Sequence, residues 1–256
     1  MPAKNIHERG RNLLLATMPP DERERLRTSL QSVLLDEGQV LIEPFTPIRH
    51  VYFPLSGAVS LVMPAGQSQL IEAGMVGNEG VVGVCLSLGS DRAPMRAVVQ
   101  TSCHALRMSA KAFGAEMQRN GPLADAVHLY AQSYMVMLAQ GLVCIRAHPI
   151  EQRCARWLIM LHDRAYADQF RLTQQTLARM LGVRRATVSE VASRLQKRGL
   201  VRYERGVMNI VDRAGLERAA CECYGVVRRE LARLLAVPLA RRRKPLLEKA
   251  ATVTQE

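Results

Sequence analysis

The stretch from Thr173 to Arg198 constrains the fold more than any other part of the chain, because it specifies two short helices joined by a tight turn. Thr173 is a suitable N-cap, since its hydroxyl can accept hydrogen bonds from the free amides of the first helical turn. Gly182 follows the apolar residues of this helix, at the position where helix ends favour a left-handed residue. Apolar residues recur at helical spacing from Thr187 to Leu195, which predicts the second helix. The pattern as a whole predicts a helix-turn-helix.

The outward face of the second helix is polar and rich in arginine. Arginines at a helix N-terminus suit the major groove of DNA, where a guanidinium group can donate two hydrogen bonds to guanine. An ordinary helical hairpin with a solvated, charged face is the alternative interpretation. The residues that we assign to DNA are Thr173, Gln174, Arg184, Arg185, Ala186, Thr187, Ser189, Glu190, Arg194, Arg202 and Arg205.

These residues divide into two expected roles. Arg185 and Ser189 lie four positions apart, so their side chains project from the same side of the helix. We expect Arg185 to contact a base edge, with guanine preferred, and Glu190 to accept a hydrogen bond from either a cytosine amino group or Arg194. Phosphate contacts fix register without specifying sequence, and we assign them to Thr173, Gln174, Arg202 and Arg205.

The residues after the second helix predict a β-hairpin of the kind that often follows a helix-turn-helix as a wing. Gly199 ends the helix, and two apolar-rich segments flank a turn at Arg205-Gly206. Arg202 and Arg205 would then place positive charge near phosphates. A further helix is predicted from Arg213 to Ala236.

The positive charge of the chain is concentrated in the part that contains the helix-turn-helix. Residues 1–145 hold 12 basic and 12 acidic side chains, so the whole formal charge of +12 lies in residues 146–256. This asymmetry favours a polyanionic partner. A membrane surface is the competing polyanion, but we find no basic amphipathic helix with a bulky aromatic face. The chain also lacks an apolar run of about 18 residues and a secretory signal, so we expect a cytoplasmic protein with no membrane partner.

The six cysteines are scattered and form no pair separated by two residues. In a cytoplasmic chain this argues against a disulfide framework. Cys221 and Cys223 are the only close pair, and their spacing is poor for zinc. We therefore expect incidental or buried thiols and no metal site.

Short apolar segments separated by glycine and proline fill the N-terminal half. A helical region is predicted over residues 5–32, with a break at Met18-Pro19-Pro20. About eight strands then follow at a spacing typical of a β-sandwich or jelly-roll barrel. Their predicted ranges are 33–35, 40–42, 50–53, 58–63, 69–72, 81–84, 96–100 and 105–108, and a short helix follows over 109–118.

A long apolar helix is predicted after Gly121-Pro122, and Asp125 is the only charged side chain between Leu123 and Ile145. Its apolar residues alternate at spacings of four and three, which is typical of a coiled-coil seam. Such a helix is either the core of one domain or an interface with a second copy. We place a homodimer interface on Leu123, Val127, Tyr130, Tyr134, Met137 and Gly141. Another amphipathic helix is predicted over residues 150–165.

The order of these parts resembles the Crp/Fnr family of bacterial transcription regulators. The most specific stretch is residues 172–189, followed by Leu200-Val-Arg202. Residues 53–57 are also similar, as are residues 77–83, where the family's phosphate-binding turn lies. The resemblance implies an α+β fold in four parts. These are a cyclic-nucleotide-binding-like β-roll (jelly-roll) sensor domain (1–120), a dimerisation helix (121–147), a winged helix-turn-helix domain (148–236) and a basic tail, expected to be disordered (237–256).

The resemblance also implies a homodimer that binds a palindromic operator in double-stranded DNA and contacts RNA polymerase. The family's cyclic AMP binders hold the cyclic phosphate with an Arg-Ser pair about ten residues after a Gly-Glu-Leu turn. Here Arg92 follows Glu79 at thirteen residues, and the next residues are Ala93-Pro94, with no Ser or Thr. Leu138-Ala139-Gln140 stands where those binders place Thr-Ser. We therefore expect no response to cyclic AMP. The β-roll is either vestigial or senses another small-molecule effector, for which Glu79, Arg92 and Arg96 are the candidate contacts; no cofactor is assigned.

Three classes of function remain. The first and preferred one is a DNA-binding transcription regulator. An enzyme that acts on DNA is disfavoured, because the helix-turn-helix half shows no clustered acids, nucleophile pair or phosphate loop. A ligand-binding module that regulates a protein partner is the alternative, against which the basic winged helix argues.

Overall fold

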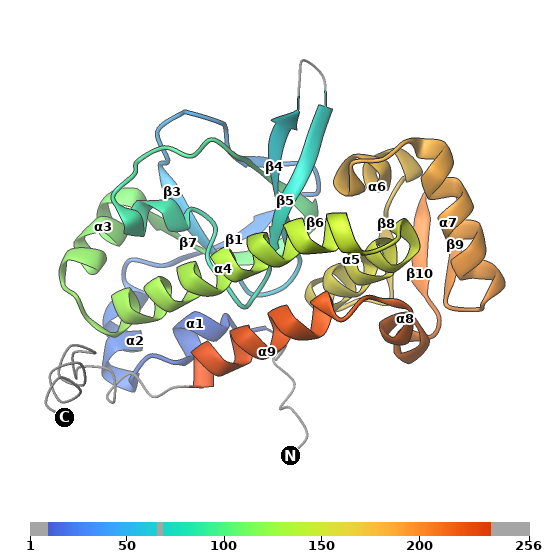
Figure 1. Ribbon diagram of the computed structural model, residues 1–256. Helices are drawn as coiled ribbons and strands as arrows, with labels where there is room; N and C mark the ends of the chain where they lie inside the picture. Colours follow the sequence, from blue (N-terminus) through green and yellow to red (C-terminus); the bar gives the residue numbers. More distant parts are fainter. Residues whose placement is uncertain (1–9, 66–68, 237–256) are drawn as a thin grey trace, which may run out of the picture.

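The computed structural model describes residues 10–65 and 69–236, arranged as a β-roll and a winged helical domain that share one long helix. That helix, α4 (Pro122–Ala147), runs along the β-roll toward the C-terminal domain, and α9 (Cys223–Ala236) lies beside it (Figure 1). Within the described residues no helix is long and apolar enough to cross a membrane. The predicted basic tail, 237–256, lies outside them.

The β-roll consists of two antiparallel sheets, as the sequence predicts. One has the order β1 (Gln31–Leu35), β7 (Cys103–Ser109), β3 (His50–Pro54). The other has the order β2 (Val40–Ile42), β6 (Arg96–Thr101), β4 (Ala58–Ala65), β5 (Gln69–Val76). The side chains that face the interior are apolar and buried, including Val51, Phe53, Val59, Met75 and Val99.

Two local predictions in this half are wrong. The segment 81–84 is not a strand: Val82 forms only an isolated bridge with Tyr52, because Gly83 adopts a left-handed φ of 93° and starts the 3-10 helix η1 (Val84–Leu88). Residues 5–9 of the helical region predicted over 5–32 lie outside the described residues, and the described part is shorter than predicted, with α1 (Leu13–Ala16) and α2 (Pro20–Arg27) separated at the predicted proline break. The helix α3 (Ala110–Gln118) is confirmed, and Ser109 caps it.

The apolar stripe of α4 packs against its own β-roll. Two glycines of the roll allow this close approach: a Cβ atom at Gly80 would lie 2.2 Å from the Tyr130 ring, and one at Gly74 would lie 2.8 Å from Met137. The dimer assignment is therefore wrong for five of the six members of this stripe, because these five are buried within the protomer, whereas Gly141 is half-buried and its assignment stays a prediction. The buried five are Leu123, Val127, Tyr130, Tyr134 and Met137.

Within the described residues, the C-terminal part begins with α5 (Ile150–Ala165) and continues through a three-stranded sheet and four further helices, α6 to α9. The sheet has the order β8 (Gln169–Arg171), β10 (Val207–Ile210), β9 (Val201–Glu204), of which β8 was not predicted. The helix predicted over 213–236 is interrupted, because Ala220 is extended and separates α8 (Arg213–Ala219) from α9. As a result, α9 leaves the winged domain and packs on α4.

Candidate nucleic-acid interface

The two helices of the motif have the predicted caps and the predicted core. The Thr173 hydroxyl accepts a hydrogen bond from the Thr176 amide at 3.0 Å, which starts α6 (Gln174–Leu181). Gly182 ends α6 with a left-handed φ of 65°, and α7 (Arg185–Lys197) begins three residues later. The angle between the helices is filled by buried side chains, namely Leu177, Ala178, Leu181, Val188 and Val191.

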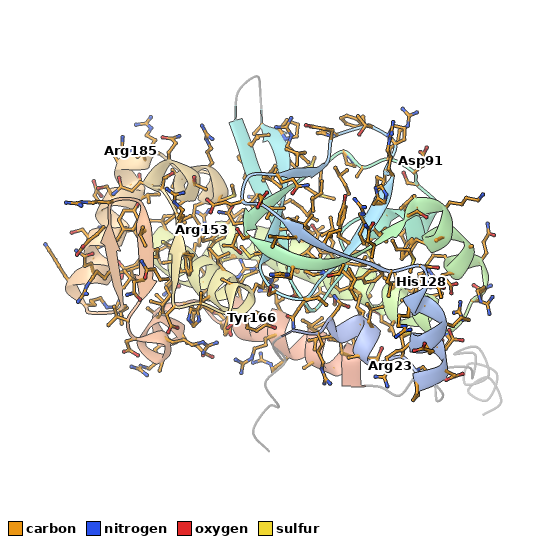
Figure 2. The ribbon with its side chains drawn as sticks, turned by 180° about the vertical axis from the view of Figure 1, so that it is seen from behind. Arg23, Asp91, His128, Arg153, Tyr166 and Arg185 are labelled. Carbon is orange, nitrogen blue, oxygen red and sulfur yellow. The ribbon has the colours of Figure 1, made fainter. Side chains whose placement is uncertain are left out.

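Three of the residues assigned to DNA meet on the exposed side of this pair. Arg185 Nε donates a hydrogen bond to the side-chain oxygen of Gln174 at 3.4 Å. The side-chain nitrogen of Gln174 in turn donates to Ser189 Oγ at 3.4 Å. Arg185 projects away from the body of the molecule at the helix-turn-helix end (Figure 2). Within the described residues its guanidinium makes a single long hydrogen bond, the one to Gln174, and the side chain is exposed, so it is available to a ligand.

The wing follows as predicted. Arg205 and Gly206 both have positive φ, 49° and 78°, which gives the two-residue turn that suits a right-twisted hairpin. The Gln196 side chain of α7 accepts a hydrogen bond from the Tyr203 amide at 2.8 Å, and this fixes the wing against the second helix. Arg202 and Arg205 are both exposed.

Of the two partners considered for Glu190, Arg194 is not paired with it, and the other, a cytosine amino group, stays a prediction. Arg194 Nε donates to Glu151 of α5 at 2.9 Å instead of pairing with Glu190, and Arg198 binds the other oxygen of Glu151 at 2.7 Å. Glu151 thus ties the C-terminal half of α7 to α5. Of the remaining residues assigned to DNA, Arg184, Ala186 and Glu190 are exposed, and Thr187 is half-buried.

The candidate effector contacts are not brought together. Glu79 is buried, and its carboxylate accepts hydrogen bonds from Arg164 of α5, with Arg164 Nε at 2.9 Å from Oε1. Arg96 is paired with Glu43 at 2.8 Å, and Arg92 lies exposed beside Asp91 and the carbonyl of Phe45. Each of the three thus has its own partner in the protomer, and the partner of Glu79, Arg164, could not be predicted from the sequence. A joint role of the three as effector contacts stays a prediction.

Two family models match the sequence, and between them they cover most of the described chain. Residues 33–120 match the cyclic nucleotide-binding domain, and residues 152–219 match the Crp-like helix-turn-helix domain. The chain belongs to the Crp/Fnr family. It is a DNA-binding transcription regulator of the Crp/Fnr type with a cyclic-nucleotide-binding-like domain.

Solved structures share this fold at low sequence identity. A putative Crp/Fnr-family transcriptional regulator from Eubacterium rectale is 15% identical with a TM-score of 0.63, over 80% of this chain and 96% of that one. The c-di-GMP responsive global regulator CLP of Xanthomonas campestris is 20% identical (TM-score 0.60, 75% and 99% covered). FixK2 of Bradyrhizobium japonicum is 14% identical (TM-score 0.63, 75% and 98% covered). A search of curated proteins gave no match.

The space between β-roll and α4 in this Crp/Fnr-family protein is filled by aromatic side chains. Tyr130 covers Gly80, and Tyr134 covers Gly74. The cavity that remains beside Glu79 and these tyrosines has a volume of about 20 Å³. That is room for a water molecule and far below the several hundred Å³ of a typical ligand site.

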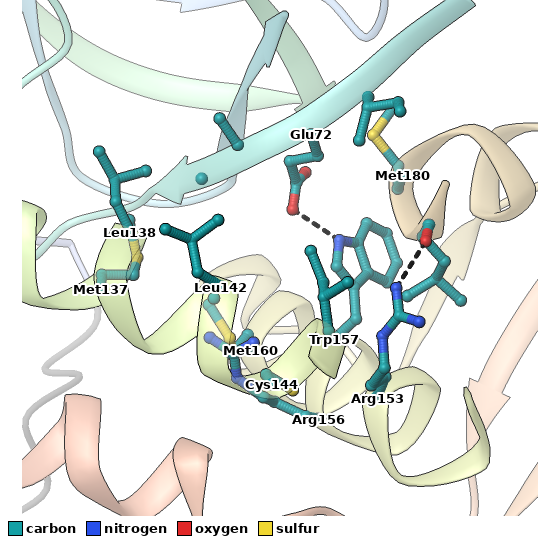
Figure 3. Close-up of a pocket in the computed structure, with 16 residues that line it drawn as sticks. Glu72, Met137, Leu138, Leu142, Cys144, Arg153, Arg156, Trp157, Met160 and Met180 are labelled. Atoms are coloured by element: carbon teal, nitrogen blue, oxygen red, sulfur yellow. Dashed lines mark hydrogen bonds between the residues drawn. The ribbon is translucent and has the colours of Figure 1, made fainter. Parts of the chain in front are cut away.

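A larger cavity of about 260 Å³ lies between β5, α4, α5 and α6, where the two domains meet (Figure 3). Its wall is mostly apolar, with Glu72 at one side. Trp157 Nε1 donates to Glu72 Oε1 at 2.7 Å, and Ser60 Oγ donates to the other oxygen. Burial raises the pKa of Glu72 to about 7 in spite of these hydrogen bonds. On the opposite side, Arg153 donates to the Leu181 carbonyl at the end of α6. This site could not be predicted from the sequence, because its members come from four separate elements.

Proposed function

We propose that this regulator binds a palindromic operator as a cytoplasmic homodimer, with α7 of each protomer in a major groove, and that it contacts RNA polymerase there. The observation that supports it best is the exposed group of Gln174, Arg185 and Ser189 at the start of α7, flanked by the arginines of the wing. Base contacts from α7 and phosphate contacts from the wing suit the docking geometry of a helix-turn-helix.

The exposed face of α4 supports the homodimer. Met135, Leu138, Leu142 and Ile145 follow one another at spacings of three, four and three, and three of them are more than half exposed (60%, 68% and 56% for Met135, Leu142 and Ile145). Three large exposed apolar side chains on one seam are typical of a helix that packs on its symmetry mate. This seam adjoins the stripe that packs on the β-roll, and it replaces that stripe as our dimer interface.

We further propose that no cyclic nucleotide binds in the β-roll, and that the cavity beside Glu72 is where a small, largely apolar effector would act. The cavity is lined by the β-roll, the dimerisation helix and α6. An effector bound there would therefore contact the sensor domain, the dimer interface and the helix-turn-helix at once. Leu138, Leu142 and Ile145 belong both to its wall and to the exposed seam, so a partner helix would close its open side.

Selection of bound sequences from a random duplex library, followed by binding titrations at two salt concentrations, tests the proposal. We expect a two-fold symmetric consensus, two protomers per duplex and an affinity that falls steeply with salt. A consensus without symmetry, or equal affinity for all sequences, contradicts it. Calorimetry with cyclic AMP should show no binding at micromolar concentration, in accord with the filled β-roll.

A further inference from the structure

Four metal-ligating side chains meet where α4 ends and α9 begins. Cys144 lies in the last turn of α4, and His148 is the residue that ends this helix. Cys221 lies between α8 and α9, and Cys223 is the first residue of α9. One ligand atom from each of the four lies within 4.8 Å of all the others. The three thiols are buried and His148 is half-buried, so the group is enclosed by protein.

Two distances in this group are close to those of one tetrahedral metal centre. The sulfur atoms of Cys144 and Cys221 are 3.4 Å apart, and Cys223 Sγ is 3.5 Å from His148 Nδ1. Ligands at the zinc–sulfur and zinc–nitrogen bond lengths of about 2.3 and 2.0 Å stand about 3.8 Å (S to S) and 3.5 Å (S to N) apart in a tetrahedron. An iron–sulfur cluster needs its cysteines farther apart than this group allows, since several atoms must fit between them.

The surroundings orient the ligands as metal sites require. His148 Nε2 lies 3.1 Å from the Glu222 carboxylate, so this nitrogen carries the proton and Nδ1 presents its lone pair to the three thiols. Gln140 Nε2 donates a hydrogen bond to Cys223 Sγ at 3.1 Å. Arg156 lies beside Cys144 (Figure 3), where its charge offsets that of thiolates. Cysteines that meet by chance in a protein core need no such neighbours, so the presence of Glu222, Gln140 and Arg156 around this group supports a metal site.

We propose that Cys144, His148, Cys221 and Cys223 bind one zinc ion. Three sulfurs and one imidazole form a donor set that zinc prefers, and four protein ligands in a closed site indicate a structural rather than a catalytic ion. Each cysteine loses its proton to solvent on binding and no electron is transferred. The ion clamps the start of α9 to the end of α4, directly before Pro149, where the winged domain joins. Zinc thereby fixes the orientation of the DNA-binding domain relative to the dimerisation helix.

Metal analysis of the full chain, purified under reducing conditions, tests the site. We expect one zinc per chain and, by competition with a chromophoric chelator, a dissociation constant tighter than about 1 nM. Cobalt in place of zinc should give thiolate-to-metal charge-transfer bands and the intense visible bands of a tetrahedral site. Cys144→Ser and Cys221→Ser should each weaken binding by more than about 100-fold. Cys85→Ser is the matched control, because Cys85 is half-buried on η1 outside the group.

Metal binding and alkylation of the wild-type chain test the site even if the serine variants fail to fold. Zinc should protect Cys144, Cys221 and Cys223 from alkylation, and a chelator should release them, while Cys85 reacts at the same rate in both conditions. The proposal is overturned if the reduced protein binds no zinc or cobalt, whatever the alkylation rates, because the three thiols are buried and burial alone slows their alkylation. A Cys144–Cys221 disulfide that forms in air, together with no metal binding after reduction, would instead assign the pair to thiol oxidation. None of these measurements involves DNA, so their failure leaves the function proposed above untouched.

Discussion

Glu79 and Arg164 form a buried ion pair across 85 residues of sequence, and this pair joins the turn after β5 to α5. Arg164 Nε lies 2.9 Å from Glu79 Oε1, and Arg164 also donates to the Met160 carbonyl at 2.8 Å within its own helix. Both side chains are almost fully buried. The carboxylate that the family resemblance offers to a ligand is therefore used to connect the β-roll to the first helix of the DNA-binding part.

We predict that Arg164→Met lowers the free energy of unfolding by about 3–5 kcal/mol, because it leaves the Glu79 carboxylate buried without a partner. Replacing both members, as Glu79→Gln with Arg164→Met, should recover much of this loss, since no buried charge then remains. Urea unfolding of the two single variants and the double variant measures the coupling. Strictly additive losses would show that the two side chains do not stabilise each other.

The features that could be predicted from sequence are those fixed by residues close along the chain. The Thr173 cap, the Gly182 helix end and the turn at Arg205-Gly206 are local, because each depends on one hydroxyl or one left-handed residue. The long helix shows the limit. Its periodicity identified a buried stripe correctly, but periodicity does not reveal what the stripe packs against, and here it is the β-roll of the same protomer.

The parts that could not be predicted depend on which distant elements come together. Cys144 and Cys221 are 77 residues apart in the sequence. They meet only because the helix predicted over 213–236 is interrupted after α8, so that α9 packs along α4. Only one residue separates Cys221 from Cys223, and this spacing is poor for a zinc motif that is read from the sequence alone. The sequence therefore favoured the interpretation that the cysteines are incidental or buried thiols. Arg194 illustrates the same limit, because its partner Glu151 lies 43 residues away on α5.

The dimer seam yields a second prediction. Leu142→Asp places a carboxylate at a side chain that is 68% exposed in the protomer and, in the proposed dimer, faces its partner. We expect the dimer dissociation constant to rise by at least about 100-fold, because two apolar contacts are lost and two charges are desolvated. Light scattering over a dilution series measures the change.

Val143→Asp is the matched control for the seam. Val143 is 51% exposed on the same helix, but it points about 100° away from Leu142 around the helix axis. It should therefore leave the dimer largely intact. Tyr134→Asp should cause unfolding instead of clean monomers, since Tyr134 is part of the protomer core. A wild-type protein that is monomeric at micromolar concentration contradicts the homodimer itself.

The raised pKa of Glu72 predicts how the stability of the protein depends on pH. Its pKa is about 7 in the folded chain and 4.5 ordinarily, because burial disfavours the carboxylate. The folded state therefore holds a proton that the unfolded state releases between these values, so this group lowers stability as pH rises from about 4.5 to 7. The penalty is complete above pH 7 and amounts to at most about 3 kcal/mol.

Glu72→Gln should remove that penalty. The variant keeps an oxygen that can accept from Trp157, so we expect its melting temperature to exceed that of the wild type at pH 8 and to approach it at pH 5. Thermal unfolding at several pH values makes the comparison. Glu43→Gln is the control, because Glu43 is an exposed carboxylate paired with Arg96 on the surface of the β-roll. Equal wild-type and Glu72→Gln curves across this range would show that Glu72 is ionised in the folded chain.

Arg185, Arg202 and Arg205 are all exposed, but they occupy different positions relative to a DNA duplex. Arg185 starts α7 and touches Gln174, so its guanidinium stands where a recognition helix meets base edges. Arg202 and Arg205 belong to the wing, at its first strand and its turn, where a helix-turn-helix contacts the backbone. Substitution of the two kinds should therefore have different consequences.

We predict that Arg185→Ala costs about 1–3 kcal/mol on the selected operator and relaxes preference at one symmetric position, with guanine favoured there in the wild type. Arg202→Ala or Arg205→Ala should weaken all sequences alike and reduce the slope of log affinity against log salt by about one, because each removes a phosphate contact. Sequence selection with each variant, combined with salt titrations on operator and random duplex, separates the two classes. An unchanged consensus for Arg185→Ala, with a reduced salt slope, would place Arg185 on a phosphate and leave sequence recognition to other residues of α7.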